Sequence, residues 1–147
     1  MKSITLIFGA CILLCLKSYS QDFQKLGDSE VDKSKVKIAQ DFATNFMTKL
    51  KSGASYKFQD EAIDALKNQF TEENQKIVYQ QVKSQFGDFQ LLKYAETWIQ
   101  SNNKSIQIIR LKGDFEKSNK KLEIRVVLNE SGKIMGFFII PWSDMLN

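Results

Sequence analysis

The residues that could carry out chemistry in this chain are carboxylates, lysines and tyrosines, because histidine is absent and the two cysteines stand at positions 11 and 15. Without histidine there is no Ser–His or Cys–His nucleophile pair and no zinc site of the usual His/Cys type. The glycines form no phosphate-binding loop of the GxGxxG or GxxxxGK(S/T) kind. Catalysis would depend on Asp, Glu, Lys or Tyr with strongly shifted pKa values, and we predict no catalytic residue, no metal and no cofactor.

A group of polar and aromatic side chains is the strongest candidate for a ligand site. If the C-terminal half forms strands that pair through turns centred on Asn102-Asn103 and Ser118-Asn119, alternation decides which side chains face the helices. That core face then carries, at one end, Tyr94, Glu96, Trp98 and Gln107. Because buried polar groups need partners, this end is predicted to be open to water or to line a cavity. A one-residue slip would reverse the faces, and one bulge would move part of the set.

The chain holds two arginines, Arg110 and Arg125, and the same register puts both on the outer face of the sheet. As a pair they could grip an anion bidentately. The alternative, which we favour, is that they pair with Asp114 and Glu123 on a solvated face or at the rim of a dimer. The last strand is apolar on both faces, which implies a cover on the outer one. The predicted surface for a partner or second subunit comprises Ile108, Arg110, Arg125, Val127 and Phe138.

Three helices and four strands are predicted to position these residues. Apolar residues recur at helical spacing from Asp32 to Ser52, a shorter helix follows over Tyr56–Gln69, and Thr71 is a candidate N-cap for a third helix that ends at Phe86. After Gly87, aromatic and β-branched runs separated by short polar turns indicate an antiparallel meander. The predicted strands are Phe89–Gln100, Ser105–Glu116, Lys121–Asn129 and Ile134–Pro141. Helices followed by strands indicate an α+β fold.

The first twenty residues have the pattern of a cleavable secretory signal. Lys2 precedes an apolar run, Ile4–Leu16, which is shorter than the roughly 20 helical residues of a membrane span, and Ser18-Tyr19-Ser20 suits a signal peptidase. Cleavage after Ser20 would remove both cysteines, so we expect a secreted or periplasmic protein without stable membrane insertion. A lipoprotein is less favoured because Cys11 lies too early in the apolar run, and so is a buried N-terminal helix.

The chain after the signal peptide (1–20) is predicted to comprise a flexible N-terminal tail, residues 21–32, and a single α+β domain, residues 33–147. Loss of Lys2 and Lys17 leaves 19 of the 21 basic residues against 17 acidic ones, a net charge of +2. The two signs are interleaved, without the clustered basic footprint of a nucleic-acid-binding protein. We therefore expect no nucleic-acid partner.

Three segments carry a resemblance to a known family: residues 61–74, the run Phe86-Gly87-Asp88-Phe89, and the ending Gly132–Pro141. Together they resemble an uncharacterised family of secreted bacterial proteins in the nuclear transport factor 2-like superfamily, over about residues 33–141. The resemblance implies three N-terminal helices packed on a curved four-stranded antiparallel sheet, a cone-shaped, cystatin-like fold with a pocket and often a dimer through the sheet. It also makes Tyr79 the nearest counterpart of a large aromatic in the third helix. It carries no catalytic residues.

Three functional hypotheses follow. The first is a non-catalytic binding module that holds a small molecule, a peptide or a glycan fragment between helices and sheet, with a pocket made of Tyr79, Tyr94, Glu96, Trp98 and Gln107. The second is a structural or interaction protein that forms a homodimer, or docks an envelope partner, through its sheet. The third is an acid–base enzyme centred on Glu96, which with Tyr94 resembles the proton-transfer groups of some enzymes of that superfamily.

Overall fold

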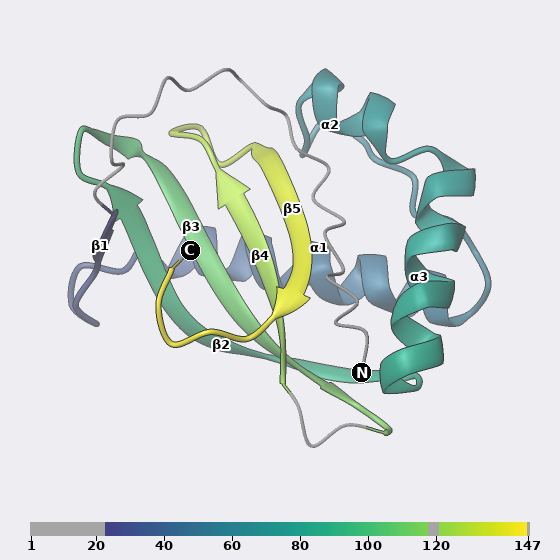
Figure 1. Ribbon diagram of the computed structural model, residues 1–147. Helices are drawn as coiled ribbons and strands as arrows, with labels where there is room; N and C mark the ends of the chain where they lie inside the picture. The colour runs from purple at the N-terminus through teal and green to yellow at the C-terminus, as the bar shows by residue number, and fades with distance from the viewer. Residues whose placement is uncertain (1–22, 118–120, 147) are drawn as a thin grey trace.

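The computed structural model describes residues 23–117 and 121–146, and these form three helices packed on one face of an antiparallel sheet (Figure 1). The sheet has five strands in the sequential order β1-β2-β3-β4-β5. The elements are β1 (Phe23–Lys25), α1 (Lys33–Lys51), α2 (Asp64–Gln69), α3 (Glu72–Phe86), β2 (Phe89–Gln100), β3 (Asn103–Phe115), β4 (Leu122–Leu128) and β5 (Ile134–Pro141). The predicted signal peptide lies outside the described residues. No helix among those described is long and apolar enough to cross a membrane.

The prediction of four strands preceded by three N-terminal helices is wrong, because the described residues begin with a fifth strand. β1 lies within the segment predicted to be a flexible tail and pairs with the end of β2, with Phe23 opposite Gln100 and Lys25 opposite Trp98. β1 has only three residues and is flanked by polar ones, so its sequence shows no alternation of apolar and polar residues that would identify a strand. Its conformation comes from the long-range hydrogen bonds of the pairing, which sequence periodicity does not contain.

Helices α1 and α3 confirm their predictions. The Asp32 side chain accepts hydrogen bonds from the first free backbone amides of α1, and Thr71 accepts one from the Asn74 amide at the start of α3. Such caps satisfy donors that have no partner inside the helix. Gly53 and Gly87 follow the two helix ends with φ of 80° and 78°, a conformation that glycine adopts without steric cost.

The second predicted helix is shorter than expected. It begins at Asp64 rather than at Tyr56, because the preceding residues make tertiary bonds that a helix would not allow. The Ile134 amide donates to the Glu61 carbonyl (2.7 Å), and the Ile63 amide donates to the Ile134 carbonyl (3.0 Å). This segment therefore lies beside the start of β5, and it packs its aromatic side chains against the core without forming a helix.

The core between the helices and the sheet combines aliphatic side chains with a cluster of aromatic rings. Phe46 of α1 is fully buried, and its ring centroid lies 4.8 Å from that of Phe137 on β5. The rings of this cluster contact one another at tilted or edge-on angles, the arrangement that aromatic pairs prefer. The cluster comprises Phe42, Phe46, Tyr56, Phe58, Phe70 and Phe137. It fills the space between α1, the 54–63 segment and β5.

A register shift in β2 changes which of its side chains face the helices. Tyr94 pairs with Leu111, but the next pair is Glu96 with Arg110, so Ala95 is an extra residue in the ladder. An extra residue of this kind inverts the alternation beyond it. Glu96 and Trp98 consequently lie on the outer face, and the prediction that they share the core face with Tyr94 is wrong. The pairing of β3 with β4 keeps the predicted faces, so Arg110 lies on the outer face as expected.

Replacing Phe46 with alanine tests whether the aromatic cluster supports the fold. Because Phe46 is completely buried, we expect Phe46→Ala to lower the free energy of unfolding by about 3–5 kcal/mol, measured by urea denaturation. Ile77, on α3, is 40 % exposed, and Ile77→Ala serves as the control with an expected loss below about 1 kcal/mol. Equal losses in the two variants would contradict this account of the core.

Candidate functional site

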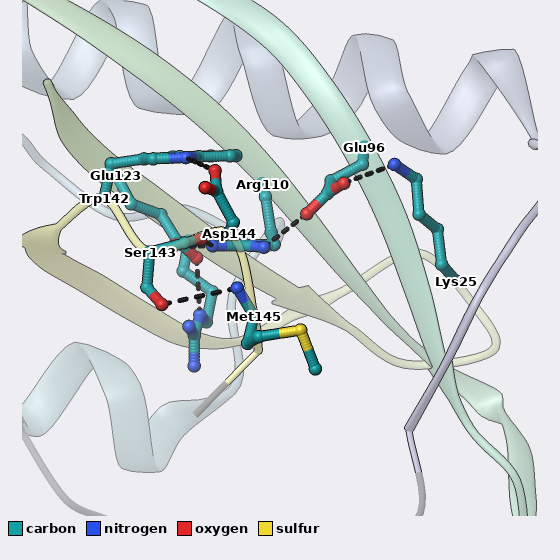
Figure 2. A network of polar contacts seen from close by, with 9 residues as sticks. Lys25, Glu96, Arg110, Glu123, Trp142, Ser143, Asp144 and Met145 are labelled. Carbon is teal, nitrogen blue, oxygen red and sulfur yellow. Dashed lines mark hydrogen bonds and ion pairs between the residues drawn. The ribbon is translucent and has the colours of Figure 1, made fainter.

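The outer face of the sheet carries a buried arginine at its centre. Arg110 lies in the middle of β3, opposite Glu96 on β2 and Arg125 on β4, and its exposed fraction is 0 %. A guanidinium ion removed from water needs compensating charge and hydrogen bonds. Figure 2 shows that the strands on both sides, and the chain after β5, supply them.

Arg110 has three hydrogen-bond acceptors and an aromatic neighbour. Its Nη1 donates to Glu96 Oε1, and its Nη2 donates to Glu123 Oε2 at 2.6 Å. Nη2 also donates to the carbonyl oxygen of Ser143 at 2.5 Å. The ring of Trp142 lies over the guanidinium, with its centroid 4.2 Å from Cζ, a distance at which the negative face of the ring attracts a cation. The Nε atom of Arg110 is buried without a hydrogen-bond partner.

Two further cations complete the network around the carboxylates. Lys25 on β1 places Nζ 2.6 Å from Glu96 Oε2, and Arg125 donates from Nε to Glu123 Oε1 at 2.7 Å. Each carboxylate therefore lies between two cations, in the order Lys25, Glu96, Arg110, Glu123, Arg125. Glu123 is fully buried and Glu96 nearly so. Positive and negative side chains therefore alternate along this row, which crosses strands β1, β2, β3 and β4.

The network holds its central groups in their charged forms. Burial raises the pKa of the Glu96 carboxyl, but the hydrogen bond from Lys25 and the charge of Arg110 outweigh it, and the resulting pKa lies below the ordinary value of 4.5. Burial likewise lowers the pKa of Arg110, and the bonds to Glu123 and Glu96 reverse this and raise it. Glu96 is therefore ionised and paired at neutral pH.

The segment Trp142–Leu146, which we call the C-terminal strap, covers this network. The Trp142 ring lies between two cations of β3, since Lys112 Nζ is 4.1 Å from its centroid on the same ring that covers Arg110. The Trp142 amide donates to the Lys121 carbonyl (3.0 Å). Within the strap, Trp142 Nε1 donates to Asp144 Oδ1 (3.0 Å), and Met145 is 66 % exposed. The strap thus contributes an aromatic face and one carbonyl to the site.

The residues predicted to form a ligand pocket do not lie together. Tyr94 faces the helices, where its hydroxyl lies 3.0 Å from Thr97 Oγ1 and its ring lines a hollow of about 380 Å³ beside the first turns of α1. Gln107 is on the same face, opposite Leu128. Glu96 and Trp98 are on the other side of the sheet. A ligand role for any one of these residues stays a prediction.

Tyr79 lies in a different hollow, of about 210 Å³, between the end of α1 and α3. Its hydroxyl donates to Asp88 Oδ1 at 2.8 Å. Burial, together with this bond, raises the pKa of Tyr79 to about 12, so its proton stays in place near neutral pH. Of the five predicted pocket residues, Tyr79 and Tyr94 therefore line separate hollows and Gln107 lies elsewhere on the helical face. Glu96 and Trp98 lie on the outer face of the sheet.

The residues predicted to form a partner surface do lie together. Ile108 pairs with Val127, while Arg110 pairs with Arg125, which pairs in turn with Phe138. All five point to the face that the helices leave uncovered. Of the predicted arginine partners, Glu123 is confirmed, but the Arg110–Glu123 pair is buried within the chain, so the solvated face predicted for it is wrong. Asp114 bonds instead to Lys121 at 2.6 Å.

Sequence reasoning missed Lys25, Trp142 and Ser143 as members of this site. One signal was available, since Arg110 interrupts an apolar run, Ile108–Leu111, in a strand whose neighbours are buried. Its partners on β1 and in the strap are distant in sequence and have no motif. In the described part of the chain, no three side chains of the metal-binding types come close enough to hold an ion.

The fold and site define a small α+β domain with an aromatic core on one side of its sheet and a buried ion network on the other. Residues 43–137 match the family described as "Protein of unknown function (DUF3887)". Because the match covers more than half of the chain, the protein belongs to this family. Neither a curated protein nor a solved structure matches this chain.

Replacing Arg110 alone should destabilise the fold more than replacing Arg110 together with both of its carboxylate partners. Arg110→Met leaves two buried carboxylates without their shared cation, so we expect a loss of about 3–5 kcal/mol in unfolding free energy. A triple variant with Glu96→Leu, Arg110→Met and Glu123→Leu should recover most of this loss, because the two buried carboxylates are removed together with their shared cation. Urea denaturation measures both. The control Lys37→Met, which breaks an exposed ion pair with Asp41, should lower the unfolding free energy by less than about 1 kcal/mol. A triple variant less stable than Arg110→Met would contradict this prediction.

The lowered pKa of Glu96 gives stability a defined pH dependence. A carboxyl whose pKa is lower in the folded state stabilises the fold above its unfolded pKa, here 4.5, and this contribution is lost as the pH falls through the folded pKa. The difference in unfolding free energy between wild type and Glu96→Gln should therefore be largest at pH 7 and shrink below pH 4.5. Urea midpoints at pH 7 and at lower pH test this. Glu130→Gln, at an exposed position, should show no such trend.

Proposed function

We propose that this protein is an exported, non-catalytic interaction domain of the nuclear transport factor 2-like class, which associates with a second copy through the outer face of its sheet. The observation that supports the proposal best is the grouping of Ile108, Arg110, Arg125, Val127 and Phe138 on a face that none of the described helices covers (Figure 1). The helices packed on one face of a strongly twisted sheet support the class.

The composition of this face suits a protein interface. An apolar row, with Val127 between Ile108 and Gly136, lies next to the row that joins Arg110, Arg125 and Phe138. Interface cores combine apolar and aromatic side chains with arginine, while other charges are depleted there. Val127 and Phe138 are half-buried in the single chain, which leaves them area to bury against a partner, whereas Ile108 and Arg110 are already buried within the chain.

The edge of the sheet supports the same association. β5 is the last strand in the sheet order. At its beginning, Ile134 pairs with residues 61–63 through the bridge to Ala62 and two backbone hydrogen bonds. Apolar side chains cover both of its faces. An edge with these properties is prone to associate with another chain unless something covers it. A second copy placed over the outer face would cover β5 as well.

The state of Glu96 supports a role without catalysis. A general base works best with a pKa near the working pH, whereas the pKa of Glu96 is lowered and both of its oxygens are paired with cations. Export is supported by the signal pattern of residues 1–20, and an exported chain that begins at Gln21 would contain no cysteine.

A second candidate function is binding of a small molecule, a peptide or a glycan fragment beside Tyr94. The hollow there is about 380 Å³, within the range of small-molecule sites. Its lining combines the apolar side chains of Val31 and Val36 with Lys33 and Gln40. A ligand with an apolar body and an acidic group would match this lining.

Native mass spectrometry and sedimentation equilibrium of the exported chain test both candidates. We expect a dimer at tens of micromolar and a monomer for Val127→Glu, because a carboxylate in the apolar row would be buried without a partner. Ile77→Glu, on the helical side, should remain a dimer. A wild-type monomer at high micromolar concentration would overturn the homodimer. A bound mass that is released on denaturation and lost in Tyr94→Ala would favour the second candidate.

A further inference from the structure

We propose that the C-terminal strap is a displaceable occupant of a peptide-docking site centred on Arg110, and that the C-terminal segment of a second copy takes the same place in trans. The inference rests on the proposed association through the outer sheet face and names the segment that the two copies exchange. It is carried by the geometry of Arg110, Trp142 and Ser143.

The floor of the site is built without the strap. Arg110 and Glu123 are completely buried, and the groups that hold the guanidinium in place, Glu96 and Glu123, belong to strands β2 and β4. Displacing the strap therefore leaves an oriented guanidinium, flanked by carboxylates, on the outer face of the sheet. Such a preorganised donor favours binding because little ordering remains to be done.

The contacts of the strap indicate which chemical groups the site around Arg110 binds. The strap brings an aromatic ring, held between Arg110 and Lys112 at 4.2 Å and 4.1 Å from the two cationic centres, and a backbone carbonyl at 2.5 Å from Arg110 Nη2. Any extended peptide with a tryptophan followed by an accessible carbonyl presents the same two groups. The buried Nε of Arg110, which has no hydrogen-bond partner, shows that the strap does not use every donor of the site.

The strap has the properties of a segment that can be exchanged. It follows directly after Pro141, the exposed end of β5, and two of its hydrogen bonds are internal: Trp142 Nε1 to Asp144, and the Met145 amide to Ser143 Oγ at 3.3 Å. These bonds would travel with the segment. In Figure 2 Met145 extends away from the charged residues, in agreement with its exposure of 66 %.

A second copy is the occupant that these observations favour. Its C-terminal segment has the same sequence and reproduces the observed contacts without new chemistry, which makes exchange of an identical element a low-cost route to a dimer. Because β5 lies at the edge of the proposed interface, two copies placed over this face bring each strap near the partner's Arg110. Exchange would then add the strap contacts to the association.

A binding assay with the whole exported chain, residues 21–147, tests the docking site. The probe is a fluorescein-labelled peptide with the sequence of residues 141–147, and the protein is Trp142→Ala, which keeps Arg110 but loses the ring that competes for it. We expect saturable binding at least tenfold tighter than to wild type, by fluorescence anisotropy. A peptide in which alanine replaces tryptophan should not bind, and the protein variant Ile77→Ala should behave like wild type.

Two results would overturn the docking site. One is a folded Trp142→Ala protein, shown by an unchanged circular dichroism spectrum, that does not bind the peptide. The other is equal binding of the peptides with and without tryptophan. If Trp142→Ala does not fold, hydrogen exchange on wild type decides: the Trp142 amide should exchange far faster than the amides of β3, and equally slow exchange would mean that the strap is not displaced.

Occupation in trans has its own test. Equal amounts of ¹⁴N- and ¹⁵N-labelled chains with Trp142→p-benzoylphenylalanine are mixed and irradiated. Cross-links from the strap to the β3 peptide of the other isotope are expected, and exclusively same-isotope cross-links would overturn exchange. The outcomes separate the two proposals. A dimer without peptide binding retains the proposed function and removes this inference, whereas peptide binding by a strictly monomeric chain retains the docking site and removes the dimer.

Discussion

The burial of one guanidinium is the constraint on which the outer half of the structure depends. Arg110 is in the middle strand of the sheet and has no exposed surface, so every element around it must contribute charge or hydrogen bonds. β2 and β4 supply Glu96 and Glu123, and the strap supplies a ring and a carbonyl. β1 is drawn into the same arrangement, because Lys25 neutralises the far side of Glu96.

The core on the helical side of the sheet and the ion network on the outer side make different contributions to the structure. On the helical side, apolar burial supplies stability without directional requirements. On the outer side, a buried network of ions adds little net stability but disfavours any register that leaves a charge unpaired. The extra residue at Ala95 is an example, since without it Glu96 would face the aromatic core instead of Arg110. The outer face of the sheet is therefore held in one geometry.

Much of the fold could be predicted from local pattern. The caps at Asp32 and Thr71, the helical spacing of α1, and the strands Phe89–Gln100 and Ile134–Pro141 all agree with the structure, because each depends on neighbours within a few residues. The prediction failed where partners are distant. The short strand β1 and the non-helical segment before Asp64 both depend on pairing with remote strands.

The sequence by itself determined the α+β class, the placement of α1 and α3, the outer position of Arg110 and Arg125, and the absence of histidine chemistry. These features follow from composition and from periodicities of two and about 3.6 residues. Only the tertiary structure decided the side on which Glu96 and Trp98 lie, the distance of Tyr79 from Tyr94, and the cover over Arg110. Each depends on one inserted ladder residue or on contacts between segments far apart in the chain, and neither leaves a periodic trace in the sequence.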